Sequence, residues 1–464
     1  MNFEVTADLH LHSKYSRAVS REMEIPTMAA WAARKGIGLV GTGDFTHPLW
    51  SRELEAGLEE AGEGVYRLKS KGVINLKKVP ELSGAAGRSE EEGVLFMLTT
   101  ELSCIYEEKG KVRRIHLVVF LPSFSGVHKF VGELGKRGVN LAADGRPILA
   151  IPAAGVVEML LTADEKAIVI PAHIWTPWFG ALGENGGYDS LGEVFGRWVK
   201  WVPAIETGMS SDPAMNWRIT ELDDRRIVSF GDAHSPMKMG REATIFRRRV
   251  GSDRPRGRIS YSGVYGAIWG QKGGDWEVGG TIEFYPEEGK YHFTGHRRCG
   301  VRRSPEETKK MGVTCPVCGR SLTVGVAHRV EKLAGREVSI SATVNGDGLR
   351  VIKNADQPER PGYVMLVPLA EIVAEAVGQG ATSRKAMTVY ERLVAKRSEL
   401  AVLMRTGAEE IRETAGERVA EGIMKVRRGE VSVDPGYDGV FGQAKIWGGT
   451  KGRSDTLLDQ MALF

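Results

Sequence analysis

Two histidines and one aspartate stand at alternate positions near the start of the chain. Asp8, His10 and His12 follow a short apolar run, residues 3–7, that predicts a β-strand. Side chains two residues apart on a strand point to the same face, so we expect the three groups to lie together. Two neutral imidazoles and a carboxylate suit zinc, manganese or iron. A plain pair of surface histidines would give the same pattern, so the interpretation depends on the other strands.

Six further apolar runs carry histidine, aspartate or glutamate at or near their ends. Each residue alone has a plain explanation, since a lone His116 is more often a satisfied core residue and a lone Glu206 a helix cap or ion-pair partner. A fold that brought them all together would be unstable without cations, because burying even a neutral polar group without a partner costs about 2–7 kcal/mol. We therefore predict a metal centre. The residues are Asp44, His47, Glu101, His116, His173, Glu206, Asp232 and His234.

These apolar runs alternate with helix-like or loop stretches through the first half of the chain. The alternation predicts an α/β fold with a largely parallel sheet or barrel. In such folds the functional residues lie at the carboxyl ends of the strands. Divalent cations held there would lower the pKa of a bound water and stabilise the charge that grows on a phosphate in the transition state. We therefore expect phosphoester hydrolysis.

The motifs at residues 8–13, 43–47 and 231–235, with Glu101, His116 and His173, resemble those of the PHP (polymerase and histidinol phosphatase) domain. The resemblance implies a distorted seven-stranded β/α barrel with two or three divalent ions, which would be zinc, manganese or magnesium. This chain departs from the family pattern because two residues separate Asp44 from His47. Asp232, Glu101 and His173 are the predicted catalytic residues, and Asp232 would bind an ion and orient the attacking water. The implied ligand sets are His10, His12, Glu101 and Asp232 for one ion, Glu101, His116 and His173 for a second, and Asp44 or His47 with His234 for a third.

Two loops that follow metal-ligand candidates are predicted to contact DNA. Trp175 and Trp178 come directly after His173, and aromatic rings stacked on bases contribute about 1–3 kcal/mol per base. Ser210 and Ser211 follow Glu206 and could offer hydroxyl and backbone groups to a base edge. The alternative, that the tryptophans merely cover the barrel, has about equal weight.

A second metal site is predicted from cysteine spacing. His296 and Cys299 form an HxxC pair, and Cys315 and Cys318 form a CxxC pair a short distance further on. Paired ligands of this kind are typical of a structural, tetrahedral zinc ribbon. The fourth ligand is left open between His296 and His292. Cys104 stands apart and is predicted to be a small buried side chain.

The last hundred residues predict a compact set of helices and a tail. Apolar spacing predicts helices over residues 369–377, 387–396, 399–404 and 408–426, with Ser383 as an N-cap. These helices could grip a DNA backbone or simply pack. The final residues resemble the peptide by which replication and repair proteins dock on the β sliding clamp, with two apolar anchors and one polar anchor on a flexible tether. The residues of that peptide are Gln460, Met461, Leu463 and Phe464. A frayed tail is the alternative.

Taken whole, the chain resembles the endonuclease Q family, PHP-domain enzymes of DNA repair, in its bacterial, clamp-binding type. The resemblance implies a nick 5′ of a deaminated base (uracil, hypoxanthine or xanthine) or an abasic site, with the lesion rotated into a pocket. The alternatives are a phosphatase for small phosphate esters, a 3′–5′ exonuclease, and a DNA-binding adaptor whose metals only stabilise it. The expected domains are a barrel at 1–270, a zinc module at 271–345, a helical domain at 346–447 and a tail at 448–464.

Composition is ordinary for a globular protein. The 464 residues are 42% hydrophobic and 26% charged. No apolar run approaches the ~20 residues that a membrane helix needs, and the N-terminus shows no signal peptide. We expect a monomer in the cytoplasm, associated with the nucleoid. The net charge of +4 is small, so a DNA site would have to be a local basic patch.

Overall fold

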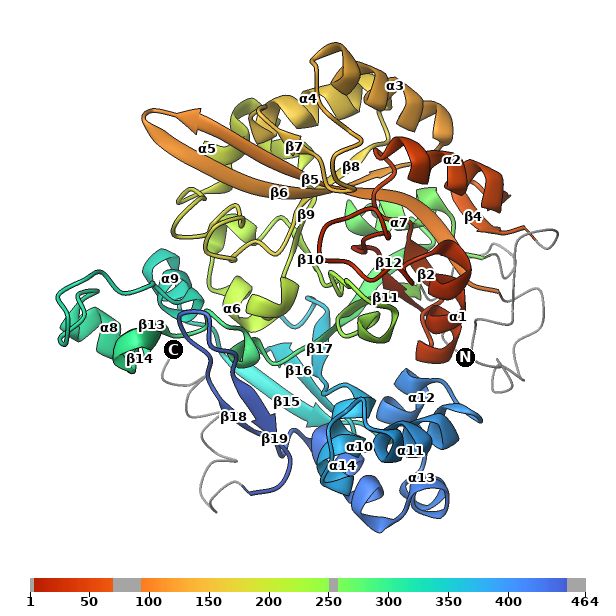
Figure 1. Ribbon diagram of the computed structural model, residues 1–464, viewed down its shortest axis with the longest axis vertical. Helices are drawn as coiled ribbons and strands as arrows, with labels where there is room; N and C mark the ends of the chain where they lie inside the picture. The colour runs from red at the N-terminus through yellow and green to blue at the C-terminus, as the bar shows by residue number, and fades with distance from the viewer. Residues whose placement is uncertain (1–3, 70–92, 250–257, 449–464) are drawn as a thin grey trace. The chain divides into compact units, whose positions relative to one another are not determined.

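The computed structural model describes residues 4–69, 93–249 and 258–448, which form two compact units (Figure 1). The first unit contains the described residues up to Gly208 together with Glu221–Gly280. The second contains Met209–Thr220 and the described residues from Thr281 onward. No helix in these ranges is both long enough and apolar enough to cross a membrane. The proposed clamp peptide, Gln460, Met461, Leu463 and Phe464, lies outside the described residues.

The first unit is built on a mixed sheet with β1 near its centre. Strand β1 (Glu4–Asp8) pairs in parallel with β2 (Leu39–Gly41) and antiparallel with β11 (Ala243–Arg248). Strand β2 continues in parallel to β5 (Leu95–Glu108), which pairs antiparallel with β6 (Lys111–Leu121). The remaining strands of this unit are β3 (Leu58–Gly62), β4 (Val65–Leu68), β7 (Ile148–Leu149), β8 (Ile168–Pro171), β9 (Ala204–Glu206), β10 (Arg226–Val228) and β12 (Trp276–Glu283).

The expectation of a largely parallel sheet with its functional residues at strand ends is wrong for β5 and β6. These strands form one long hairpin in which Ser103 faces His116, so Glu101 and His116 lie inside strands. The cause is the two-residue turn at Lys109 and Gly110, whose φ angles are 51° and 72°. Such a turn can join only antiparallel strands, since a parallel pair needs a crossover of a dozen residues or more.

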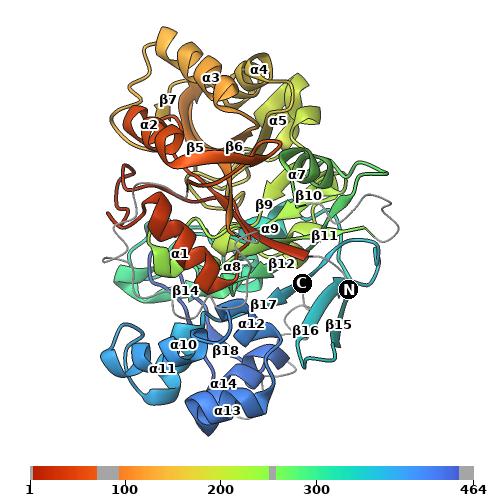
Figure 2. The same cartoon turned by 90° about the vertical axis from the view of Figure 1, so that its right-hand side faces the viewer.

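Helices and a continuous apolar core support this sheet. The core joins side chains of β1, β2, β5, β6 and β8, all under 6% exposed, to the buried face of α7 (Tyr261–Ile268). The Tyr261 hydroxyl donates to the carbonyls of Phe120 and Lys166, which holds α7 on the sheet. Both views show α3 and α4 on the same side of the β5–β6 hairpin (Figure 1; Figure 2). The other helices are α1 (Ile25–Lys35), α2 (Pro48–Gly57), α3 (Phe124–Lys136), α4 (Ala153–Ala163) and α5 (Leu191–Phe195).

The second unit combines small β elements with a group of helices. An antiparallel set is formed by β15 (Ile340–Val344), β16 (Arg350–Asn354) and β17 (Gly362–Met365). Two hairpins stand apart from it, β13 (Thr294–His296) with β14 (Val301–Arg303), and β18 (Ser432–Asp434) with β19 (Gln443–Lys445). Its helices are α6 (Pro213–Trp217), α8 (Pro305–Met311), α9 (Val326–Leu333), α10 (Leu369–Val377), α11 (Arg384–Val394), α12 (Glu399–Met404), α13 (Ala408–Ala415) and α14 (Glu417–Arg428).

The C-terminal helices follow the predicted pattern, with one break. Helices α10 and α12 have the predicted bounds, and Ser383 caps α11 by accepting a hydrogen bond from the backbone N–H of Ala386. The segment predicted at 408–426 is two helices because Gly416 has a φ of 92°, which a helix cannot include. Arg427 is buried and donates to the carbonyls of Val402 and Leu403, so it ties α14 to α12 rather than offering its charge to DNA.

Candidate metal-bound active site

Strand β1 and the residues after it bring the first ligand candidates to the site. The strand ends at Asp8, and buried Leu9 and Leu11 fix the next residues, so His10 and His12 face the opposite side together. Asp8 itself does not join them. Its carboxylate accepts hydrogen bonds from the backbone N–H groups of Gly231 and Gly240, at 2.9 and 2.8 Å, and thereby positions the loop that carries Asp232.

Three overlapping groups of potential ligands come together among the described residues. In each group the ligand atoms lie within 4.8 Å of one another. The groups share members, so a single cluster of seven side chains results. The groups are His10, His12 and Glu101; His12, Asp232 and His234; and Glu101, His116 and His173.

The spacing of these atoms is compatible with divalent cations between them. His10 Nε2 is buried, finds no hydrogen-bond partner among the described residues, and lies 3.7 Å from both Glu101 Oε1 and Asp232 Oδ1. His12 Nε2 lies 3.4 Å from Glu101 Oε2 and 3.0 Å from Asp232 Oδ1. Two ligands of one tetrahedral ion, each 2.0–2.2 Å from it, are about 3.4 Å apart. The donor set therefore fits the implied ions.

A second set of polar groups orients the imidazoles. Glu206 accepts from His10 Nδ1 at 2.9 Å, and the Thr176 hydroxyl lies 2.8 Å from His173 Nδ1. The Ser103 hydroxyl lies 3.1 Å from His116 Nε2, which leaves His116 Nδ1 toward the cluster, 2.5 Å from Glu101 Oε1. Partners of this kind fix the tautomer of a ligating histidine and raise its basicity. Glu206 was predicted among the metal-centre residues, but it belongs to none of the ligand groups in the described chain and instead holds His10.

Asp44 and His47 lie behind the cluster instead of in it. Asp44 accepts from Ser13 N at 2.6 Å and from the hydroxyls of Ser13 and Ser16, and its other oxygen lies 3.2 Å from His12 Nδ1. His47 stacks on Tyr15, with ring centroids 4.4 Å apart. The resemblance implied that one of the two holds the third ion with His234. The structure groups His234 with His12 and Asp232 and gives Asp44 the task of orienting His12.

The charges of the cluster are unbalanced without cations. Burial lowers the pKa of His116 to about 4, so this imidazole is neutral and able to ligate. Burial also disfavours the charged form of His10, but the carboxylates of Glu206 and Asp232 outweigh it and raise the pKa of His10 well above its usual value. The same opposition raises the pKa of His12. In the absence of a metal, protons on these two histidines would have to supply the positive charge that divalent ions bring.

Backbone strain is concentrated at this site. Of the six non-glycine residues with positive φ in the described ranges, three are Asp44, His173 and Asp232, at 49°, 28° and 43°. A non-glycine residue held in the left-handed region of backbone conformation costs about 1–3 kcal/mol of folding free energy. Such residues cluster at functional sites, where the surrounding structure fixes them.

Arg146 is the site residue that sequence analysis missed. Its loop had no assigned role, yet its guanidinium donates to Glu101 Oε2 at 3.0 Å and its side chain is 25% exposed. Gly145 makes the approach possible, because a Cβ there would lie 2.3 Å from Asp44 Oδ2. The one available signal was the turn-forming Asp-Gly-Arg-Pro stretch, residues 144–147, which marks a sharp bend before Arg146.

The two tryptophans of the loop after His173 differ in burial, and base stacking by Trp178 stays a prediction. Trp175 is fully buried and offers no open face to a base, whereas Trp178 is half-buried. Phe179 is 37% exposed, and its ring lies 4.5 Å from that of His116. Phe179 is therefore the aromatic residue of this loop that combines exposure with contact to a ligand candidate.

Ser210 and Ser211 belong to the second unit, which is described by itself. Ser211 is fully buried, and its hydroxyl accepts from the Asn216 amide at 3.1 Å. Ser210 ends a short 3₁₀ turn and is half-buried. Their predicted contact with a base stays a prediction.

The cysteine motif of the second unit forms a compact four-ligand group. His296, Cys299, Cys315 and Cys318 place their ligand atoms within 4.8 Å of one another, and His296 Nδ1 lies 3.4 Å from Cys318 Sγ. Three thiols and one imidazole fit a tetrahedral structural zinc. His292, the other candidate for fourth ligand, is not in the group.

We expect Cys315→Ser to remove this zinc and destabilise the second unit. Metal binding at a structural zinc site contributes directly to folding free energy, so the loss should lower the midpoint of thermal unfolding markedly. Zinc content by mass spectrometry and thermal unfolding measure the two effects. Cys104→Ala is the matched control, because Cys104 is buried in the first unit and belongs to no ligand group in the described chain, so its zinc content should not change. Full zinc retention in Cys315→Ser would contradict the assignment.

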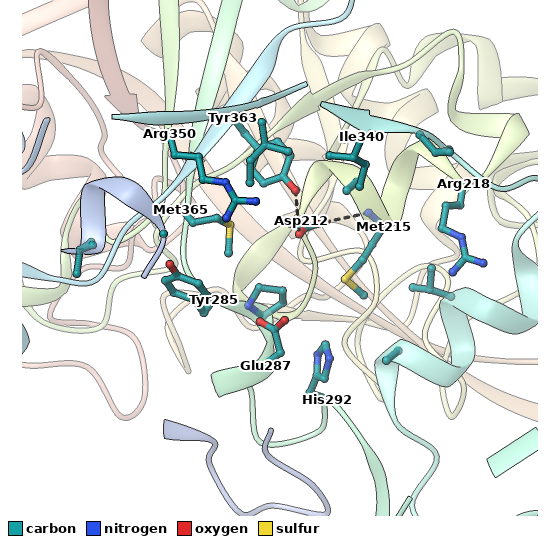
Figure 3. A pocket seen from close by; sticks show the side chains of 18 of the residues that line it. Asp212, Met215, Arg218, Tyr285, Glu287, His292, Ile340, Arg350, Tyr363 and Met365 are labelled. Atoms are coloured by element: carbon teal, nitrogen blue, oxygen red, sulfur yellow. Dashed lines mark hydrogen bonds between the residues drawn. The ribbon is translucent and has the colours of Figure 1, made fainter. Parts of the chain in front are cut away.

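The second unit also contains a cavity of about 90 Å³ (Figure 3). Asp212, Tyr285, Glu287 and His292 are among the residues that line it, with apolar side chains such as Met215 between them. Glu287 Oε2, the Tyr285 hydroxyl and His292 Nδ1 are buried without a hydrogen-bond partner in the described part of the chain. Burial raises the pKa of Glu287 to about 7 and lowers that of His292 to about 4.

These shifts predict a pH dependence that His292→Gln isolates. Between pH 6.5 and about 4, His292 is protonated in the unfolded chain and neutral in the folded chain. The free energy of unfolding therefore decreases as the pH is lowered through this range, by up to about 3 kcal/mol. Glu287 has the opposite effect on the free energy of unfolding, because its raised pKa lets the folded state bind the proton at a higher pH than the unfolded state does. Glu287 is present in both proteins, so its contribution cancels when the wild type and the variant are compared. Urea titrations from pH 7 to 4 should show the wild type losing stability relative to His292→Gln. The variant His128→Gln, at a side chain that is 60% exposed, serves as the control for replacing a histidine by glutamine.

The fold of this chain is similar to that of a class of DNA endonucleases that are specific for lesions. More particularly, the crystal structure of the lesion-specific endonuclease Q from Pyrococcus furiosus matches with a TM-score of 0.76 and 28% identity, over 98% of this chain and 99% of that one. Endonuclease Q in complex with a 27-mer duplex substrate, with an abasic lesion at the active site, matches with a TM-score of 0.75, again at 28% identity, over 97% and 99% of the two chains. These similarities support the endonuclease Q family.

Sequence relatives are consistent with this placement. YqxK from Bacillus subtilis is 27% identical over 451 residues, which cover 95% of this chain and 99% of that protein. MJ0043 from Methanocaldococcus jannaschii is 28% identical over 298 residues, 62% of this chain, and the match spans about a third (34%) of that longer protein. The protein-family model of the MJ0043 C-terminal domain matches residues 368–430, which contain helices α10 to α14.

Proposed function

We propose that this chain is a metal-dependent DNA repair endonuclease with a PHP-type barrel, which hydrolyses the phosphodiester 5′ of a deaminated base or an abasic site. The observation that carries the proposal is the cluster of His10, His12, Glu101, Asp232 and their neighbours, in a chain similar over nearly its whole length to an endonuclease crystallised on an abasic duplex. The cluster supports phosphoester chemistry, and the similarity supports DNA as its substrate.

The residues of the cluster divide the work between metal binding and positioning. Divalent ions at the three ligand groups would supply a hydroxide nucleophile near neutral pH and polarise the phosphate. Asp232, on a strained backbone next to two ligand histidines, orients the attacking water. Arg146 presents N–H donors at the edge of the site, where a guanidinium fits the non-bridging oxygens of a phosphate. Asp44 and Glu206 keep the imidazoles in place.

Selectivity would come partly from base flipping. Rotating a nucleotide out of a duplex costs a few kcal/mol, and least where pairing is already damaged. Uracil opposite guanine, hypoxanthine, xanthine and abasic sites meet that condition. Phe179 is positioned to contact a nucleotide beside His116.

The decisive experiment uses 5′-labelled duplexes with one uracil, hypoxanthine or abasic site, incubated with Mn²⁺, Mg²⁺ or Zn²⁺. A single nick 5′ of the lesion, lost with EDTA and absent on the undamaged duplex, is the expected result. Shortening from the 3′ end would instead indicate an exonuclease, and hydrolysis of small phosphate esters alone would indicate a phosphatase.

We further propose that the C-terminal peptide docks on the β sliding clamp. Gln460→Ala combined with Phe464→Ala should abolish binding to immobilised clamp without changing nicking of free oligonucleotides. Unchanged clamp binding would reject this part of the proposal.

A further inference from the structure

The turn between β18 and β19 exposes two apolar side chains that the proposed chemistry does not use. Phe441 is 70% exposed and Val440 is 40% exposed. Burying a phenylalanine side chain is favourable by about 1.5–3 kcal/mol, so leaving one in water on a short turn is a cost without a structural return. The Asp-Pro-Gly-Tyr-Asp-Gly stretch at residues 434–439 comes directly before this pair.

The turn is held rigidly. Its backbone N–H groups at Gly436, Gly439 and Gly442 donate to the carbonyls of Glu287, Lys290 and Glu288, at 2.8, 2.8 and 3.0 Å. Tyr437 and Val440 exchange two backbone hydrogen bonds, and Phe293 bridges to Tyr437, which joins the hairpin to the β13 region (Figure 1). The exposed ring is thus presented by a backbone with little freedom left to lose on binding.

A strained residue completes the turn. Asp438 has a φ of 42°, and its carboxylate accepts from Arg297 N at 2.7 Å and from the Thr323 hydroxyl at 2.6 Å. Strain of this kind in a surface turn, fixed by two side-chain hydrogen bonds, indicates that the position of the two apolar residues matters.

Cations stand on the segment that is hydrogen-bonded to this turn. Lys290 Nζ lies 5.7 Å from the centre of the Phe441 ring, and Arg297 and Arg298 are exposed on the neighbouring 3₁₀ turn. In the part of the chain that the structure describes, none of these three forms an ion pair. The carboxylates of the turn are already engaged, Asp438 as above and Asp434 by Arg302 at 2.8 Å. An exposed aromatic flanked by free cations is complementary to a stack of bases flanked by phosphates.

We infer that Phe441, supported by Val440, is a wedge that inserts between base pairs of duplex DNA, with Lys290, Arg297 and Arg298 on the flanking phosphates. Proteins that kink a duplex commonly insert an apolar side chain at a base step, and the unstacking of that step is offset by new contacts. The inference rests on the proposed function, because it assumes that the partner is DNA. In this proposal Phe441 separates two stacked base pairs and does not contact the reacting phosphate.

The test compares Phe441→Ala with Phe441→Trp and with Val344→Ala, an exposed apolar residue of the same unit at 60% exposure. Binding is measured in EDTA to an abasic duplex with 2-aminopurine beside the lesion, whose fluorescence rises on unstacking. We expect Phe441→Ala to weaken binding about tenfold and to suppress the fluorescence rise, Phe441→Trp to retain both, and Val344→Ala to change neither. Thermal unfolding of all three should match the wild type, since neither side chain belongs to the core.

The outcomes separate this inference from the proposed function. Wild-type binding and fluorescence in Phe441→Ala would overturn the wedge even if lesion-specific nicking is found. A Phe441-dependent fluorescence rise in a protein that fails to nick the lesion would support the wedge and reject the endonuclease. A change in oligomeric state caused by Phe441→Ala, with DNA binding intact, would assign the surface to contact between copies of the chain and overturn the wedge.

Discussion

Replacing Asp232 by asparagine is expected to lower the rate of lesion nicking by at least about 10³-fold, because in the proposed mechanism its carboxylate binds a metal ion and orients the water, which a neutral amide cannot do. Asp232 Oδ1 lies 3.0 Å from His12 Nε2 and 3.7 Å from His10 Nε2, so one oxygen serves two of the imidazoles. The rate constant is measured by single-turnover nicking of a uracil duplex at saturating Mn²⁺.

A second measurement distinguishes lost chemistry from lost folding. Added Mn²⁺ should raise the unfolding temperature of the wild type, since a ligand that binds only the folded state stabilises it, and should raise that of Asp232→Asn much less. Asp356→Asn is the control, because Asp356 is an exposed acid of the second unit and should leave nicking and metal response intact. Wild-type nicking by Asp232→Asn would remove this residue from the mechanism.

Replacing Arg146 by glutamine is expected to lower nicking by about 10²–10³-fold while the metal content stays at the wild-type level. Within the described residues the guanidinium bonds to the cluster through Glu101, so its removal should leave the ligand atoms in place and take away donors for the phosphate. Arg146→Lys should recover part of the loss, because a lysine keeps the charge but not the planar fork.

The control for this prediction lies close by in the fold. Arg17 is 75% exposed and approaches Asp144 at 3.5 Å, next to the Arg146 loop, so Arg17→Gln tests whether any nearby cation has the same effect. We expect nicking by Arg17→Gln to fall less than about threefold, as is usual for an exposed charge. Loss of metal from Arg146→Gln would show instead that Arg146 acts by stabilising Glu101, and would contradict a direct role on phosphate.

Local chemistry explains what was predictable. The helices from α10 to α12 follow from apolar spacing and a serine cap, which act within a few residues of each other. The grouping of His296 with three cysteines follows likewise from spacing, because HxxC and CxxC pairs each close a tight turn. The break at Gly416 was missed because a single glycine is tolerated in many helices, and only its φ of 92° shows that this one ends the helix.

The amino-acid sequence by itself determined which residue types gather at the site, since no other arrangement explains so many histidines and carboxylates at strand after strand. Tertiary structure alone decided which of them group at ligand distance from one another and which orient the members of those groups. The hairpin turn at Lys109 and Gly110 puts Glu101 in mid-strand between two ligand groups, and Ser13 and Ser16 occupy the oxygens of Asp44. The tertiary structure also brings Arg146, from the loop after α3, to Glu101. The reason is that ligand sharing depends on ångström distances between residues far apart in the chain, which periodicity and spacing do not encode.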